Sequence, residues 1–176
     1  VANTCLVLQS PTQIPSPVLI NFDDLANAGL IADSYRASHG VRFENSDTTQ
    51  AIIYANEPTE AHSPPNMAIN SATSVSNNIP MRIDFGGSKT HVGMYLGNGE
   101  TLLPTAVMLA YDGAGNIICQ GTYNQVPELH TAFLGMHDPA GRIMRVTVDY
   151  GNTSLSESID DLFFAPGATL PTATNT

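Results

Sequence analysis

The sequence has few basic residues and no tryptophan. Its 176 residues include 16 acidic side chains against six lysines and arginines, so the formal net charge is −10. Proteins that bind nucleic acids present a basic surface to the phosphate backbone, and anionic membranes attract the same kind of surface. The composition therefore argues against both partner classes, and we expect neither nucleic acid nor membrane as a partner.

Long apolar runs and known catalytic motifs are also missing from the sequence. No run approaches the roughly 20 apolar residues that cross a bilayer. Nucleophile-elbow, P-loop, zinc-protease and dinucleotide-binding motifs are absent, and no spacing of glutamates singles out a glycosidase pair. We therefore expect a non-catalytic protein, with a hydrolase whose site has no recognisable motif as a minor alternative.

Only two cysteines are present, Cys5 and Cys119, and they have no metal-binding spacing. Two cysteines in a secreted chain usually pair, whereas two separate buried thiols are the alternative. The predicted disulfide closes a loop of just over a hundred residues, which is worth about 4–5 kcal/mol in the chain-entropy model. The disulfide is conditional on an oxidising compartment. A low-charge surface rich in Ser, Thr and Asn is common among secreted proteins, so we expect an extracellular, secreted protein.

Proline and threonine mark both ends of the chain. Residues 9–17 contain three prolines, and residues 165–176 form an uncharged tail of Pro, Thr and Ala. Such segments are typical of extended linkers between modules. We predict a linker over 1–17, one folded domain over 18–164 and a second linker after it, all within a longer protein that has neighbouring domains.

Short apolar stretches separated by turn residues recur along the domain, about ten residues apart. This pattern is typical of an antiparallel sandwich or barrel, and only residues 23–38 could hold a helical turn. Period-two alternation then divides each strand into two sides. It predicts that Met144, Val146 and Val148 point into the core.

Four side chains share the outward face of a hairpin predicted over residues 81–97, with its loop at 86–90. These candidate ligand-binding residues are Arg82, Asp84, His91 and Tyr95. An aromatic ring beside hydrogen-bonding groups is what a sugar needs for recognition. A solvated sheet face with a cross-strand ion pair is the alternative interpretation.

Two pairs of aspartates lie in apolar stretches near opposite ends of the domain: Asp23 with Asp24, and Asp160 with Asp161. Alternation places Asp160 on the apolar face of the last strand, and the first and last strands of a sandwich often lie side by side. Four converging carboxylates repel one another unless a cation joins them, and Ca²⁺ prefers such oxygen ligands. The alternative is that these aspartates cap turns or face solvent.

The order of these stretches resembles that of bacterial extracellular jelly-roll domains. It runs from FDDL at 22–25, through GVRF at 40–43 and SPPN at 63–66, to YDGAGN at 111–116 and IDDLFF at 159–164. The order is similar to that of galactose-binding-like β-sandwiches, which include many carbohydrate-binding modules. The resemblance implies an all-β, antiparallel, two-sheet β-sandwich with a structural calcium that joins its first and last strands.

The resemblance assigns the calcium to Asp23 and Asp160, with backbone carbonyls completing the shell. The sequence departs from the family pattern in one respect. Carbohydrate-binding modules often stack sugars on tryptophan, but this chain has no tryptophan, so sugar binding would fall to tyrosine and polar groups. We therefore predict a secreted, calcium-stabilised module of a larger protein that binds a glycan or another cell-surface ligand. A structural or adhesive spacer domain without a small ligand is the alternative.

Overall fold

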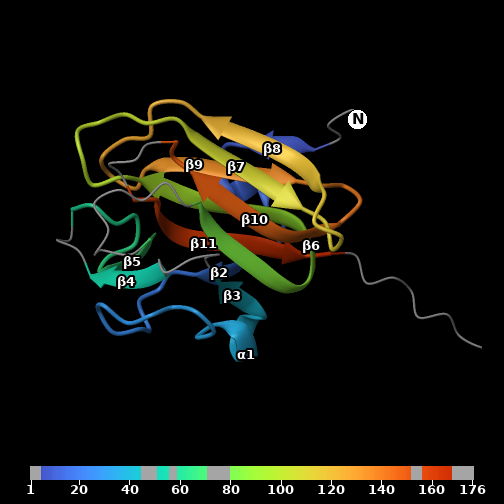
Figure 1. The fold of residues 1–176 in the computed structure, drawn as a ribbon, viewed down its shortest axis with the longest axis horizontal. Helices are drawn as coiled ribbons and strands as arrows, with labels where there is room; N and C mark the ends of the chain where they lie inside the picture. The colour runs from blue at the N-terminus through green and yellow to red at the C-terminus, as the bar shows by residue number, and fades with distance from the viewer. Residues whose placement is uncertain (1–4, 45–50, 56–58, 71–79, 152–155, 168–176) are drawn as a thin grey trace, which may run out of the picture.

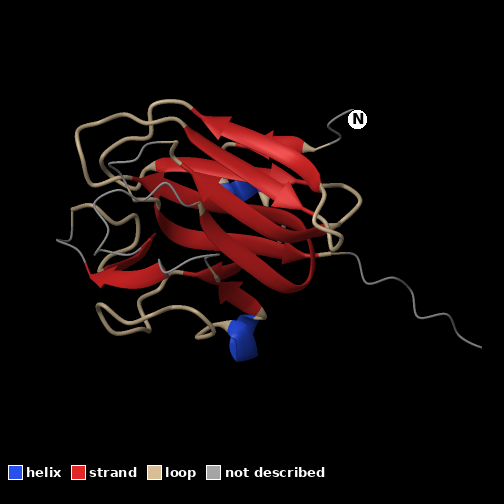
Figure 2. Cartoon of the chain, in the orientation of Figure 1, coloured by secondary structure: helices blue, strands red, loops and turns tan. Residues whose placement is uncertain are grey.

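The computed structural model describes residues 5–44, 51–55, 59–70, 80–151 and 156–167. Strands dominate this part of the chain, with two short helical segments among them (Figure 2). The all-β, antiparallel class predicted from the sequence is confirmed. Among the described helices, none has the length and apolar character that crossing a membrane requires.

Eleven strands and two helical segments make up the described fold. In chain order they are β1 (Leu6–Leu8), η1 (Pro11–Gln13), β2 (Val18–Ile20), α1 (Arg36–His39), β3 (Val41–Phe43), β4 (Ala51–Ala55), β5 (Asn66–Asn70), β6 (Met81–Gly97), β7 (Ala106–Tyr111), β8 (Ile117–Tyr123), β9 (Ala132–His137), β10 (Ile143–Asp149) and β11 (Ser158–Pro166).

The long strand β6 belongs to both sheets of the sandwich. Its first part, residues 81–85, pairs with β3 and β10, and β10 continues to β7 and β8. Its last part, residues 91–97, pairs with β9 and β11, which continue to β1, β2 and β5 (Figure 1). We call these the β3–β8 sheet and the β1–β11 sheet.

The hairpin predicted over residues 81–97 is therefore wrong. Residues 86–90 look like a polar loop, but they continue the strand from one sheet into the other. Gly86 and Gly87 lie at this crossing, and glycine often marks the place where a strand bends sharply between sheets. As a consequence, the four candidate ligand residues do not share one face.

Inward side chains from both sheets form the core, as the alternation predicts for most strands. On β6 the predicted inward side chains are all buried: Met81, Ile83, Phe85, Val92, Met94 and Leu96. On β10 the prediction is wrong for Met144, which is only partly buried, whereas Ile143 is fully buried. The reason is a shift in the pairing with β6 between Ile143 and Arg145.

The N-terminal segment is part of the folded body, although its prolines suggested a linker. β1 pairs with β9, and η1 follows it. The Ser10 hydroxyl caps η1 by accepting a hydrogen bond from the Thr12 amide, while the Gln13 side chain accepts one from the Ser10 amide. Leu8 and Ile14 then pack on the outside of the β1–β11 sheet.

The predicted C-terminal linker also overlaps the fold. The predicted linker begins inside β11, because Ala165 and Pro166 still pair with β6. Residues 168–176 lie outside the described residues.

The predicted disulfide between Cys5 and Cys119 is present, with the two Cα atoms 5.6 Å apart. It joins the residue before β1 to β8. Since these strands belong to different sheets, the bond ties the two layers of the sandwich together.

Candidate functional site

An aromatic cluster covers part of the outward face of the β1–β11 sheet. The ring of Tyr95 on β6 lies 5.3 Å from that of Phe133 on β9, and Phe133 lies 6.0 Å from Phe163 on β11, both pairs in edge-to-face geometry. His62 stacks on Tyr95 with ring centroids 3.5 Å apart and planes 12° apart. Tyr95 therefore lies on the outward face as predicted, but His62 covers one face of its ring.

A pair of glycines makes room for Phe133. Gly93 and Gly135 lie opposite each other on β6 and β9. A Cβ atom on Gly93 would lie 2.5 Å from Cζ of Phe133, and one on Gly135 would lie 3.1 Å from its Cε1. A side chain at Gly93 would push the ring away, so the glycines fix where this aromatic side chain can lie.

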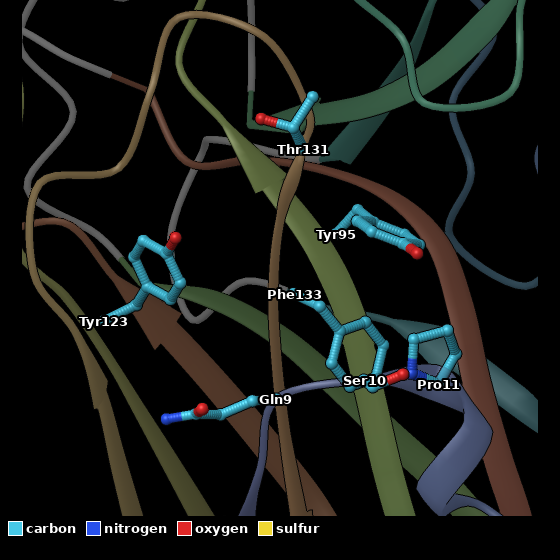
Figure 3. Close-up of a pocket in the computed structure, with 7 residues that line it drawn as sticks. All are labelled: Gln9, Ser10, Pro11, Tyr95, Tyr123, Thr131 and Phe133. Carbon is cyan, nitrogen blue, oxygen red and sulfur yellow. The ribbon is translucent and has the colours of Figure 1, made fainter.

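A cavity of about 420 Å³ opens between this cluster and the N-terminal segment. Its lining combines aromatic rings with amide and hydroxyl groups: Gln9, Ser10, Pro11, Tyr95, Tyr123, Thr131 and Phe133. Figure 3 shows Tyr123 and Gln9 on one side of the β9 ribbon, with Tyr95 and Pro11 on the other. We call this the aromatic cavity.

Several polar groups in the aromatic cavity have no partner among the residues that the structure describes. The hydroxyls of Tyr95 and Tyr123 and the side-chain amide of Gln9 make no hydrogen bond to any residue that the structure describes. Burial, followed by the charge of Asp161, raises the pKa of Tyr95. The Tyr95 hydroxyl therefore stays protonated at neutral pH, and it can both donate and accept hydrogen bonds.

Sequence reasoning found Tyr95 but missed the rest of this cavity. Gln9, Ser10 and Pro11 were assigned to a linker, and Tyr123, Thr131 and Phe133 come from strands and a loop whose spatial meeting depends on the β1–β9 and β6–β9 pairings. The sequence offered one indication of this packing. Gly93 and Gly135 lie at outward positions of neighbouring strands, which leaves room for a large side chain, here Phe133.

Arg82 and Asp84, the other half of the predicted ligand face, lie in the β3–β8 sheet. Arg82 Nε lies 2.7 Å from one carboxylate oxygen of Asp84, and Arg145 Nε on β10 lies 2.7 Å from the other. The Arg145 guanidinium also lies 5.8 Å from the centre of the Tyr111 ring. This geometry matches the alternative interpretation, an ion-paired sheet face.

His91 stacks on His137 of the neighbouring strand, with ring centroids 3.9 Å apart and planes 4° apart. Its Nδ1 lies 2.9 Å from the Thr90 hydroxyl, and its side chain is nearly buried. Burial and then the nearby His137 lower the pKa of His91. The predicted ligand residue is therefore a packed, neutral imidazole at neutral pH.

The first and last strands lie side by side as predicted, with Ile20 of β2 opposite Leu162 of β11. However, β11 contains a bulge, because the pair Asp160–Tyr95 is followed by the pair Phe163–Gly93. Asp161 has a φ of 49° at this bulge. The extra residue shifts the alternation, so Ile159 and Leu162 both point inward, and the predicted assignment of Asp160 to the face of Leu162 is wrong.

The chain itself compensates the two buried aspartates of β11. Asp160 accepts hydrogen bonds from the amides of Ser63, at 2.8 Å, and Asp161, at 2.7 Å. Asp161 accepts one from the Ser63 hydroxyl at 2.6 Å, and its other oxygen lies 2.7 Å from Nδ1 of His62. Burial still raises the pKa of Asp160 to about 7.

The N-terminal aspartates have protein partners as well. Asp23 accepts hydrogen bonds from the Asn66 amide and the Asn21 side chain, at 3.1 and 2.9 Å. Asp24 is exposed and accepts one from the Tyr35 hydroxyl at 2.5 Å.

Over the described part of the chain, no group of three or more His, Cys, Asp and Glu side chains is arranged to hold a metal ion. The four aspartates thus do not fit one calcium site that uses all of them. Calcium at Asp23 and Asp160 stays a prediction, since these two carboxylates are close enough for Asp23 to raise the pKa of Asp160.

A serine–histidine pair, His130 with Ser158, is buried and closed to solvent. His130 Nε2 lies 2.7 Å from the Ser158 hydroxyl, and its Nδ1 lies 3.0 Å from the Glu60 carbonyl. Both side chains are buried, and burial lowers the pKa of His130 to about 4. The Tyr150 hydroxyl donates to the Ser158 carbonyl nearby. The pair has the spacing of a nucleophile and base, but its burial indicates a structural role.

No protein-family model matches this chain, and the search of characterised proteins found no similar sequence. Solved structures do resemble it. The K2 cleaved adhesin domain of Lys-gingipain matches 86% of this chain and 99% of its own length, with a TM-score of 0.56 and 14% identity.

An arabinose-bound α-L-arabinofuranosidase, MgGH51, matches 87% of this chain with a TM-score of 0.55 and 14% identity, although the match spans only 27% of the enzyme's chain. The CBM22-1 xylan-binding domain of Paenibacillus barcinonensis Xyn10C covers 72% of this chain and 87% of its own length at a TM-score of 0.45 and 9% identity, a likeness too low to carry an argument. The first two similarities support the β-sandwich fold and say nothing more about this chain.

Proposed function

We propose that the protein is a non-catalytic module that binds a neutral carbohydrate in the aromatic cavity. The observation that carries the proposal is the lining, in which aromatic rings stand beside polar groups that have no partner among the described residues. Sugars need both, because their C–H faces pack on rings while their hydroxyls exchange hydrogen bonds with amides and hydroxyls. Concave sites of this kind are where small ligands usually bind.

The likeness to the Lys-gingipain adhesin domain and to the arabinofuranosidase chain supports the β-sandwich fold on which the proposal rests. The absence of tryptophan shifts the aromatic role to Tyr95, Tyr123 and Phe133. Because His62 already covers one face of Tyr95, we assign the main stacking role to Tyr123 and a hydrogen-bonding role to the Tyr95 hydroxyl.

We also propose an extracellular location, within a larger protein. The disulfide supports it, since such bonds persist in oxidising compartments. Calcium at Asp23 and Asp160 is the remaining part of the proposal, and it contributes to stability rather than to binding.

Affinity electrophoresis and calorimetry against neutral oligosaccharides of xylose, arabinose and galactose test this function. We expect at least one of them to bind, and we expect Tyr123→Ala to weaken that binding by roughly 1–3 kcal/mol, the size of a lost aromatic contact. Tyr95→Phe removes only a hydroxyl and should weaken binding by about 1 kcal/mol.

Tyr111→Ala is the matched control, since this tyrosine lies on the outward side of the other sheet. If no oligosaccharide binds, or if Tyr111→Ala weakens binding as much as Tyr123→Ala does, the proposal is wrong. The chain would then fit the spacer alternative, or a ligand site on the other sheet.

A further inference from the structure

A second polar surface lies at the other end of β6, beside α1 and β3, and it gathers most of the protein's positive charge. Four of the six basic residues are here: Arg36, Arg42, Arg82 and Arg145. Among the residues that the structure describes, three acids pair with them: Asp33, Glu44 and Asp84. The cluster thus has an excess of positive charge on a chain whose formal net charge is −10.

The pairing within this arginine cluster is uneven. Asp84 is held by Arg82 and Arg145, each through a contact of 2.7 Å. In contrast, Arg36 reaches Asp33 only at 3.6 Å and is 67% exposed. Arg36 and Arg42 therefore share one acid, while Asp84 has two arginines to itself.

Arg42 is also incompletely paired. Its Nε lies 3.0 Å from the same Asp33 oxygen but makes no well-directed hydrogen bond to a described residue. Its Nη1 lies 3.4 Å from Glu44. The two arginines with the weakest partners are the ones that line a cavity of about 170 Å³, together with Gly40, Asp84, Phe85 and Gly86.

The lining of this arginine cavity has a mixed chemistry. Guanidinium groups donate paired hydrogen bonds that match the geometry of a carboxylate. Asp84, neutralised by its own two arginines, places acceptor oxygens in the same wall. Gly40 and Gly86 are joined by a backbone hydrogen bond of 2.7 Å and leave the floor without side chains.

We propose that the arginine cavity binds a uronic acid residue of an acidic saccharide. Arg36 and Arg42 hold its carboxylate, and Asp84 accepts hydrogen bonds from its hydroxyls. Inorganic sulfate has no hydroxyl to donate to Asp84, and an acidic peptide needs an extended groove rather than a cavity of about 170 Å³. The site is separate from the aromatic cavity, because the two lie at opposite ends of β6.

Calorimetric titration with a trimer of galacturonic acid at low salt tests the proposal, with the neutral galactose trimer and inorganic sulfate as comparisons. We expect the acidic trimer to bind in a way that weakens with salt. Arg36→Gln should weaken it about tenfold or more, since it removes a charge-assisted hydrogen bond from an exposed side chain. Asp33→Asn should tighten binding, because it frees both arginines from their shared acid.

Ala37→Gln, an exposed neighbour in α1, is the matched control and should leave binding unchanged. Tyr123→Ala should also leave it unchanged, which separates this site from the aromatic cavity. Equal binding of the neutral and acidic trimers by the Tyr123→Ala variant, no effect of Arg36→Gln, or a loss of affinity in Asp33→Asn would overturn the proposal. Sulfate binding as tightly as the acidic trimer would overturn the assignment to a uronic acid.

Discussion

The two ends of β6 follow the same alternation but present opposite surfaces to solvent. At residues 82 and 84 the outward side chains are an arginine and an aspartate that pair with each other, and the aspartate also pairs with Arg145 of β10. At residues 91, 93 and 95 they are a histidine, a glycine and a tyrosine that pack against rings from β9 and from residue 62. The chemical character of each outward face therefore depends on the side chains that neighbouring segments bring to it, as well as on the residues of β6.

The two outward faces of β6 also differ in the segments that border them, and the N-terminal segment borders only the aromatic one. It covers part of the aromatic face, where Leu8 and Ile14 pack beside Phe133, and it forms one wall of the aromatic cavity. The arginine face is bordered instead by α1 and β3, which bring Arg36 and Arg42. The face that the N-terminal segment partly covers with apolar side chains forms the aromatic cavity. The face bordered by α1 and β3 forms a network of ion pairs.

Loss of the disulfide should have the largest effect on stability, because this bond ties the β1–β11 sheet to the β3–β8 sheet. The double variant Cys5→Ser/Cys119→Ser should lose about 2–5 kcal/mol of unfolding free energy, the usual cost of removing a native bridge from a secreted domain. Urea denaturation measures this loss. An unchanged midpoint would mean that the β1–β9 pairing alone holds the N-terminal segment in place.

Gly93→Ala tests whether the aromatic face depends on its glycine pair. The new methyl group would meet Cζ of Phe133 at 2.5 Å, so we expect a loss of about 1–3 kcal/mol from the displaced ring. Gly87→Ala, on the same strand with nothing within 4 Å of its added Cβ, is the control and should change stability by less than about 0.5 kcal/mol. Equal effects at the two sites would contradict the packing described for Phe133.

Acid should lower the stability of the fold through the buried imidazole of His91. The pKa of His91 is lowered in the fold, so below its unfolded value of about 6.5 the unfolded chain binds more protons and stability falls as the pH falls. His137→Phe keeps a ring in the stack but removes one cause of the lowered pKa. The stability of this variant relative to the parent should therefore rise between pH 7 and pH 5.

Thermal unfolding of the two proteins across this range gives the difference directly. A variant that tracks the parent at every pH would show that the histidine stack does not contribute to acid sensitivity.

The smallest expected effect concerns calcium at Asp23 and Asp160. Amide donors already satisfy Asp160, so relief of the remaining repulsion should add less than about 1 kcal/mol. Melting temperatures in chelator and in millimolar calcium should then differ by a few degrees, and Asp160→Asn should remove the difference. Identical melting temperatures for the parent protein would contradict the calcium prediction.

Local patterns predicted the parts of this fold that depend on local chemistry. Alternation placed Met81, Ile83 and Phe85 inside, and cysteine count gave the disulfide. The neighbouring positions of the first and last strands also followed from the general design of a sandwich.

The parts that failed depend on long-range pairing. A single strand that serves two sheets looks like a hairpin when its middle is Gly-Gly-Ser-Lys-Thr, and the bulge at Asp161 moves the alternation by one residue. The aromatic cavity could not be predicted because it joins Gln9 to Tyr123 and Thr131 across three strands and a proline-rich segment. The partners of the buried aspartates, His62 and Ser63, come from a loop about a hundred residues earlier in the chain.

The most direct test of the central claim is an NMR titration of the labelled protein with the neutral oligosaccharide that binds best. The Gln9 side-chain amide, the Thr131 amide and the ring signals of Tyr123 should shift together and saturate at one dissociation constant, because all three line the aromatic cavity. Signals from Arg82 and Tyr111 on the other sheet should stay in place. Shifts confined to the arginine face, or no shifts at saturating sugar, would contradict the account.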